Sequence, residues 1–259
     1  MDALSDKVVL ISGGTSGVGA AVARAAAGAG AAAVAVTGRR REQGERIVTE
    51  LRGLGAAAVY VPCDVADLAQ VRAGVDSVVA EYGRIDALVN AAGNVARGTL
   101  LDTTPELFDA HIAINLRGPF FLMQAVVTHL RQRGAPGTIV NIGSISALGV
   151  QPYLASYVAA KAGLAGLTRN VAHAHAPDRI RVNTLNIGWT DTEGEDATQR
   201  RFHGGGDDWR ERAAGRLPLG RLGSPDEIAD MVDLLLSERS GVVTGSVIDW
   251  DQSVPGAHD

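Results

Sequence analysis

The sequence predicts an α/β fold in which helices cover both faces of a doubly wound parallel β-sheet. Short apolar runs alternate with longer helical stretches along the chain, and these runs are almost continuously apolar. Continuous apolar strands are typical of parallel sheets whose two faces are both buried. Regular alternation of strand and helix indicates parallel strands joined by crossover helices.

The elements can be placed from this pattern. The expected strands are Lys7–Ser12, Ala32–Thr37, Ala57–Cys63, Ala87–Asn90, Thr138–Ile142, Arg181–Asn186 and Ser246–Asp249. The expected helices are Gly17–Ala29, Glu42–Leu54, Asp67–Tyr82, Pro105–Arg133, Ala155–Ala174 and Pro225–Ser237. Thr104 and Ser224 each precede a proline and are expected to cap helices. No repeat or linker divides the chain, so we expect a single domain over 1–259, with a substrate lid at about 190–217, where the alternation breaks.

Composition narrows the class of protein. Hydrophobic residues make up 46% and aromatic residues 4% of the chain, so the core is expected to be aliphatic. Cys63 is the only cysteine, which excludes an internal disulfide and fits a reducing compartment. A net charge of −5 argues against nucleic acid as a partner. The first apolar run is too short for a signal peptide or a membrane span, so we expect a cytoplasmic protein with no membrane partner.

A glycine-rich turn follows the first expected strand and opens a helix. It reads Ser12-Gly13-Gly14-Thr15-Ser16-Gly17-Val18-Gly19. Glycines there let backbone N–H groups approach a pyrophosphate at the positive end of the helix dipole. The turn therefore predicts a dinucleotide site, although close helix–strand packing alone would also require glycine.

The residues after the second expected strand bear on the cofactor. An acidic residue there would hold the ribose 2′-hydroxyl of NAD, but this chain reads Gly38-Arg39-Arg40-Arg41. A guanidinium suits a 2′-phosphate, whereas a carboxylate would repel it. We therefore predict NADP(H), with NAD(H) possible. Arg41 also fits a solvated helix start. Asp64, after the third strand, is placed to accept from an adenine amino group.

Tyr157 and Lys161 stand four residues apart on one expected helix, so they share a face. A neighbouring ammonium favours the phenolate and would lower the pKa of the tyrosine. Tyrosine–lysine pairs at this spacing are common by chance. Lys161, however, is one of only two lysines among 24 basic residues, which favours a function for it.

Two polar residues accompany this pair. Ser144 follows the fifth expected strand, at the edge of the sheet where open α/β folds bind ligands. Asn115 lies inside an apolar helical stretch, where an unbonded amide is costly. We therefore expect Asn115 to kink the helix or to hold a water.

In these motifs the chain resembles the short-chain dehydrogenase/reductase family over essentially its full length, with a Rossmann-type fold. The resemblance implies that Tyr157 is the general acid or base, that Ser144 polarises the substrate oxygen, and that Lys161 binds the nicotinamide ribose and tunes Tyr157. Asn115 would anchor a water in a proton relay. The implied cofactor-binding residues are Gly13, Thr15, Ser16, Gly17, Val18, Gly19, Arg39, Arg40, Asp64, Val65, Asn90, Ala91, Gly93, Tyr157, Lys161, Gly188, Thr190 and Thr192.

The chain departs from the family pattern at two places. Ile187-Gly188 stands where the family usually has Pro-Gly, and Asp251-Gln252-Ser253 stands where it commonly has Asp-Gly-Gly. The first departure leaves the path of the following loop open, and the second leaves open the subunit contacts or the substrate entrance. The resemblance also suggests a homotetramer or a homodimer.

The substrate is expected to be a small polar hydroxy or keto compound, such as a sugar, a polyol or a keto acid. The expected pocket residues are Arg97, Ser146, Ala147, Leu148, Gln151, Tyr153, Trp189, Phe202, His203 and Trp209. His203 also fits a solvated position, and Trp209 also fits a lid anchor. Reduction of a 3-oxoacyl carrier-protein substrate and a non-catalytic NADP(H) sensor are the alternatives. No metal site is expected, because His173 and His175 do not share a helix face.

Overall fold

The computed structural model of the chain describes residues 3–149 and 151–254, and the strands of this part form one seven-stranded parallel sheet. The strands are β1 Val8–Ser12, β2 Ala33–Gly38, β3 Ala57–Pro62, β4 Ala87–Asn90, β5 Gly137–Ser144, β6 Ile180–Ile187 and β7 Val247–Trp250. Their order in the sheet is β3-β2-β1-β4-β5-β6-β7. This confirms the predicted Rossmann-type, doubly wound α/β fold. The predicted domain also takes in residues 1–2, 150 and 255–259, which lie outside the described residues.

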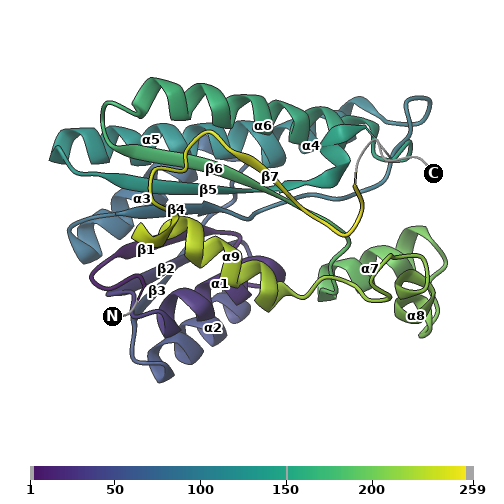
Figure 1. Ribbon diagram of the computed structural model, residues 1–259, viewed down its shortest axis with the longest axis horizontal. Helices are drawn as coiled ribbons and strands as arrows, with labels where there is room; N and C mark the ends of the chain where they lie inside the picture. Colours follow the sequence, from purple (N-terminus) through teal and green to yellow (C-terminus); the bar gives the residue numbers. More distant parts are fainter. Residues whose placement is uncertain (1–2, 150, 255–259) are drawn as a thin grey trace.

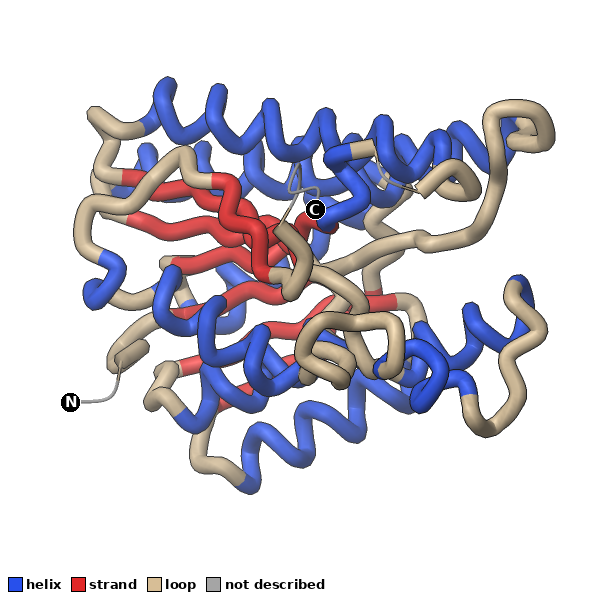
Figure 2. The backbone as a smooth tube through the Cα atoms, turned by 45° about the vertical axis from the view of Figure 1, so that its right-hand side comes forward, coloured by secondary structure: helices blue, strands red, loops and turns tan. Residues whose placement is uncertain are grey.

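Helices lie on both sides of the sheet, as Figures 1 and 2 show. One side carries α1 Gly17–Gly28, α2 Arg41–Gly53 and α9 Pro225–Leu236. The other carries α3 Leu68–Tyr82, α4 Pro105–Ile112, α5 Gly118–Arg133 and α6 Ala155–His175. The Thr104 side chain caps α4 and the Ser224 side chain caps α9. Both caps were predicted, because each of these residues precedes a proline. No helix among the described residues combines the length and the apolar character needed to cross a bilayer.

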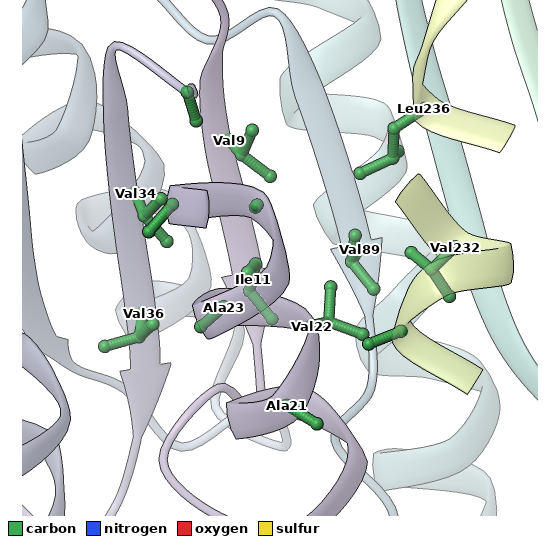
Figure 3. Close-up of a cluster of buried hydrophobic side chains, with 14 of the residues drawn as sticks. Val9, Ile11, Ala21, Val22, Ala23, Val34, Val36, Val89, Val232 and Leu236 are labelled. Atoms are coloured by element: carbon green, nitrogen blue, oxygen red, sulfur yellow. The ribbon is translucent and has the colours of Figure 1, made fainter. Parts of the chain in front are cut away.

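The core is aliphatic and is divided by the sheet into two clusters of buried side chains. In the cluster of Figure 3, Val9, Ile11 and Val34 of the strands pack against Val22 of α1 and Val232 of α9. Burying each such side chain stabilises the fold by roughly 1.5–3 kcal/mol relative to leaving it exposed. The two clusters hold the strands in register, so the loops at their ends have fixed starting points.

The predicted helix Pro105–Arg133 is continuous in space but changes its winding in the middle. A π-helical turn, Ala113–Arg117, separates α4 from α5 and contains Asn115. Such turns often occur at functional sites, because the wider winding redirects one side chain. The predicted disturbance of the helix at Asn115 is therefore present.

The segment 190–217, the expected substrate lid, has helical structure of its own. It contains α7 Glu193–Phe202 and α8 Trp209–Ala214, which project from the body of the molecule (Figure 1). Thr192 caps α7 by accepting a hydrogen bond from the backbone N–H of Glu195 at 3.0 Å. The Trp209 indole N–H donates to Asp196 at 2.7 Å, and the Trp209 side chain is buried. Trp209 thus anchors α8 to α7.

One buried carboxyl on α9 gives a stability prediction. Burial, reinforced by the charge of Asp230, raises the pKa of Asp233 to about 7. Its Oδ1 is buried and has no hydrogen-bond partner among the described residues. Because the folded protein holds this proton more tightly than the unfolded chain does, the associated stability is full below about pH 4 and is lost as the pH rises through 7.

Replacing Asp233→Asn should therefore leave the free energy of unfolding nearly unchanged at pH 4. It should raise that free energy by about 2 kcal/mol at pH 8, a value that allows for partial solvent screening. Urea unfolding at both pH values checks this, with Asp76→Asn on the exposed side of α3 as the control. An Asp233→Asn gain that is equal at both pH values would contradict the account.

Candidate active site

A cleft of about 720 Å³ opens at the carboxyl ends of the strands. It spans the point where the strand order reverses between β1 and β4, with the β1 end and the β4 end both contributing to its wall. Open α/β sheets bind ligands at such a reversal, because the loops leave the sheet in opposite directions there. The fold alone therefore marks this cleft as the candidate active site.

The glycine-rich turn forms one wall of the cleft. Gly13 has a positive φ of 75°, and a Cβ there would lie 2.5 Å from the backbone nitrogen of Ala92. A Cβ on Gly19 would lie 2.2 Å from the carbonyl oxygen of Gly13. These two positions accept only glycine, because the turn packs directly against the neighbouring loop and against the start of α1.

The start of α1 fits a phosphate. Ser16 at the N-cap makes no capping hydrogen bond, and the first turn carries no acidic residue. Side chains cap α3, α4, α7 and α9, whereas α2, α6 and α8 lack a side-chain cap as α1 does. The first-turn N–H groups of Gly17, Val18 and Gly19 thus lie at the cleft without a side-chain acceptor. A pyrophosphate would satisfy them and would meet the positive end of the helix dipole.

Two arginines extend this wall beyond the end of β2. The Arg40 Nη2 donates to the Ser16 hydroxyl at 2.7 Å, so a guanidinium lies beside the first turn of α1. An Arg39 Nη1 lies 4.0 Å from a carboxylate oxygen of Asp64. Asp64 Oδ1 accepts from the backbone N–H of Ala66. Arg39, Arg40 and Asp64 all line the cleft.

Tyr157, Ser144 and Lys161 converge at the middle of the cleft. Tyr157 is buried in the first turns of α6, and its phenol is hydrogen-bonded to Ser144. Ser144 is the last residue of β5, and its hydroxyl donates to the Ser146 hydroxyl at 3.1 Å. The Lys161 Nζ lies 5.7 Å from the centre of the Tyr157 ring. A phenol, a hydroxyl and an ammonium thus meet at one place, on two elements joined by a short connection.

Burial acts on the Tyr157 phenol more strongly than its charged neighbours do. Desolvation raises the pKa of Tyr157, while the hydrogen bond with Ser144 and the charge of Arg97 oppose this rise. The sequence predicted that a neighbouring ammonium would lower the pKa of Tyr157. This prediction is wrong, because the protein groups together raise that pKa. A raised pKa keeps the phenol protonated at neutral pH, the form that a general acid in a reduction requires.

Lys161 is buried with its ammonium group hydrogen-bonded to the backbone. Its Nζ donates to the carbonyl oxygen of Ile142 at 2.7 Å. Burial lowers the pKa of Lys161 to about 8. The lysine therefore carries its charge at neutral pH and loses it within the range of an ordinary pH profile.

Asn115 lies behind the cleft wall and holds a loop. Its side-chain oxygen accepts from the backbone N–H of Asn94 at 3.0 Å, and its Nδ2 donates to the Asn94 carbonyl oxygen at 2.9 Å. The π-helical turn directs this amide toward the loop after β4. The structure therefore shows a loop clamp at Asn115, and the water-anchoring role implied by the resemblance stays a prediction.

Most of the predicted cofactor-binding residues line the cleft. They are Gly13, Thr15, Ser16, Gly17, Val18, Gly19, Arg39, Arg40, Asp64, Val65, Ala91, Gly93, Tyr157, Lys161, Gly188, Thr190 and Thr192. Asn90 does not line it, because its side chain is buried within the sheet and donates to Asn141 at 2.8 Å. Asn90 thus ties β4 to β5 beneath the cleft.

The substrate end of the cleft differs in part from the prediction. Arg97, Ser146, Gln151, Tyr153 and Trp189 line it as expected. The cleft wall does not include Ala147, Leu148, Phe202, His203 and Trp209. Leu148 and Phe202 are exposed instead, and Trp209 is buried against α7.

Sequence reasoning missed Glu195 and Gln199, which enter the cleft from α7. Thr192-Glu193-Gly194-Glu195 matches the threonine–glutamate spacing that often opens a helix. A helix starting there would have placed Glu195 and Gln199 one turn apart on one face. The spacing of Thr192 and Glu195 is therefore the sequence signal that could have found both residues.

Comparison with known proteins identifies the class. A family model described as enoyl-(acyl carrier protein) reductase matches residues 13–253. The 3-oxoacyl-[acyl-carrier-protein] reductase of Thermotoga maritima is 38% identical over 251 residues, which are 96% of this chain and 97% of that protein. The L-rhamnose 1-dehydrogenase (NAD(P)(+)) of Azotobacter vinelandii is 34% identical over 94% of both chains.

A solved structure gives the same answer. The short-chain type dehydrogenase/reductase from Mycobacterium marinum superposes with a TM-score of 0.90 at 33% identity, covering 98% of this chain and 97% of that one. The chain therefore belongs to the short-chain dehydrogenase/reductase family. It is an oxidoreductase of this type, and the family binds a nicotinamide dinucleotide.

Proposed function

We propose that the chain is an NADP(H)-dependent oxidoreductase that interconverts an alcohol and a ketone or aldehyde on a small polar substrate. One observation supports this above the others. The Tyr157 phenol, the Ser144 hydroxyl and the Lys161 ammonium line the same cleft as the uncapped start of α1.

The residues divide the work of the reaction between them. Ser144 and Tyr157 hydrogen-bond the substrate oxygen, and Tyr157 gives its proton to that oxygen in reduction or takes it back in oxidation. Lys161 holds a positive charge beside the phenol, which stabilises the phenolate left after proton transfer. The nicotinamide, when bound, supplies or accepts the hydride at the substrate carbon. The first turn of α1 and Thr192 would hold the cofactor.

The cofactor preference rests on Arg39 and Arg40. Both guanidinium groups lie at the cleft beyond β2, and Arg40 already contacts Ser16. A 2′-phosphate would gain charge-assisted hydrogen bonds there, each contributing about 1.5–3 kcal/mol. The preference for NADP(H) over NAD(H) follows from this local positive charge.

Replacing Arg40→Gln should raise the Kd for NADPH about 10- to 100-fold and change the Kd for NADH much less, because NADH has no 2′-phosphate to lose contact with. Fluorescence titration with both cofactors measures this. Arg41→Gln is the matched control, since Arg41 is exposed, pairs with Glu45 and does not line the cleft. Wild-type protein that binds NADH as tightly as NADPH would refute the preference.

The substrate class is tested by a panel followed through the absorbance of the reduced cofactor. Sugars, polyols and small polar keto compounds should be turned over. A 3-oxoacyl carrier-protein reductase is the second candidate, favoured by the similarity to the Thermotoga maritima enzyme. Turnover of an acyl-carrier substrate alone would establish that candidate instead. Saturable NADPH binding without any turnover would favour a non-catalytic sensor.

Two further expectations stay proposals. We place the enzyme in the cytoplasm, on the single buried cysteine and its fit to a reducing compartment. A homotetramer or homodimer through α5, α6 and β7 is our proposal for the assembly, and sedimentation equilibrium tests it.

A further inference from the structure

Two opposite charges face each other at the substrate end of the cleft. Arg97 follows β4 and Glu195 lies in the first turn of α7. The Arg97 Nη2 lies 4.0 Å from Glu195 Oε1, which is too far for a hydrogen bond. The side chains are only 14% and 16% exposed. The pair is therefore largely desolvated and yet not in direct contact.

Each of the two side chains is fixed by its other neighbours. Arg97 Nε donates to His203 at 3.1 Å, and Arg97 Nη1 donates to the Val95 carbonyl oxygen at 2.8 Å. Glu195 Oε1 accepts from the Trp189 indole at 2.8 Å and from the Gln199 amide at 2.7 Å. These bonds hold the guanidinium and the carboxylate in place before any substrate enters.

One donor and one acceptor remain available at the pair. Among the described residues, Glu195 Oε2 accepts no hydrogen bond and Arg97 Nη2 donates none. A hydroxyl group both accepts and donates, so it can bond to both charges at once. A carboxylate only accepts, and it would be repelled by Glu195. A plain alkyl group would leave both charges unpaired in a desolvated site, which is costly.

The charge balance of this end of the cleft supports the same choice. The charges of Arg97 and Glu195 cancel, so the pair offers no net attraction for an anion. The two also act in opposite directions on Tyr157, since Arg97 lowers and Glu195 raises the pKa of that phenol. Both charges are therefore felt at the reacting end of the cleft.

We infer that Arg97 and Glu195 together select a neutral polyhydroxylated substrate by binding a second hydroxyl, distinct from the oxygen held by Tyr157 and Ser144. This inference rests on the proposed function. It narrows the substrate from polar compounds in general to sugars, polyols and hydroxyketones, and it disfavours keto acids and simple ketones.

The test compares three compounds of equal chain length, in a four-carbon set and in a six-carbon set. Each set contains a hydroxyketone, the ketone without the hydroxyl, and the 3-oxo acid. Wild-type enzyme should show kcat/KM for the hydroxyketone at least tenfold above both others, because a site built for a hydroxyl rejects analogues that lack it. Glu195→Gln keeps an oxygen for Trp189 and Gln199 but removes the charge. It should reduce the advantage over the plain ketone about tenfold, mainly through KM, and should raise the relative rate with the oxo acid.

Controls separate the possible failures. Glu193 lies on the same helix, is exposed and does not line the cleft. Glu193→Gln should therefore leave the kcat/KM ratios between the three compounds unchanged. Arg97→Gln is a second variant and should also lower the hydroxyketone advantage, while the NADPH Kd reports on folding of each variant. Wild-type preference for the ketone or the oxo acid, or ratios insensitive to both variants, would overturn this inference. No reduction of any compound by the wild type would instead overturn the proposed function.

Discussion

Replacing Tyr157→Phe should lower kcat by about 10² to 10⁴-fold, the usual contribution of a positioned general acid or base. The substitution removes only the phenol oxygen. The phenylalanine ring can keep the edge-on contact with His111, whose ring centre lies 6.0 Å away. Cofactor binding by the α1 turn should be nearly unchanged. The expected signature is therefore a loss in kcat at constant Kd for NADPH.

Steady-state kinetics and a fluorescence titration on the same preparation check this prediction. Tyr82→Phe is the matched control, since Tyr82 ends α3 and does not line the cleft. It should behave like the wild type. A Tyr157→Phe enzyme that retains more than about a tenth of the wild-type kcat would show that another group moves the proton.

Replacing Lys161→Met should also abolish most turnover, because the positive charge beside the phenol is lost. It carries a second consequence for stability. The folded pKa of Lys161 is about 8, below the ordinary value of 10.5, because of burial. The folded protein therefore holds this proton less tightly than the unfolded chain does. The ionised lysine costs stability below pH 8, and this cost disappears as the pH rises from 8 to above 10.5.

The free energy of unfolding of the wild type, measured against Lys161→Met, should therefore rise by about 3 kcal/mol between pH 7 and pH 11. Chemical unfolding of both proteins over this range measures the difference, in which the titration of all other groups cancels. Lys7→Met is the control, because Lys7 is ion-paired with the exposed Glu238 and has no such burial. A difference that stays flat with pH would mean that Lys161 is not charged and buried in the way described.

The fold could be predicted because it depends on local patterns that the sequence states directly. Continuous apolar runs marked each strand of the sheet to within a few residues. Thr104 and Ser224 predicted helix starts, because a capping hydrogen bond joins residues that are two or three positions apart in the sequence. The parallel, doubly wound class followed from the alternation of strands and helices, whereas the order of the strands comes from the structure.

The parts that could not be predicted depend on contacts between distant segments. Asn90 was placed in the cofactor site, but its amide bonds to Asn141 on the next strand. The pKa of Tyr157 was expected to fall beside an ammonium, whereas burial, which spacing along the chain does not reveal, raises it. Glu195 and Gln199 line the cleft because the start of α7 lies at its edge, a placement that the residues around Thr192 do not reveal.

The most direct test of the central claim follows a labelled hydride. The wild-type enzyme is given reduced cofactor deuterated on both faces of nicotinamide C4, together with a hydroxyketone, and the product is examined by mass spectrometry. The account predicts a product with one deuterium on the new carbinol carbon. A product without deuterium at that carbon would contradict it.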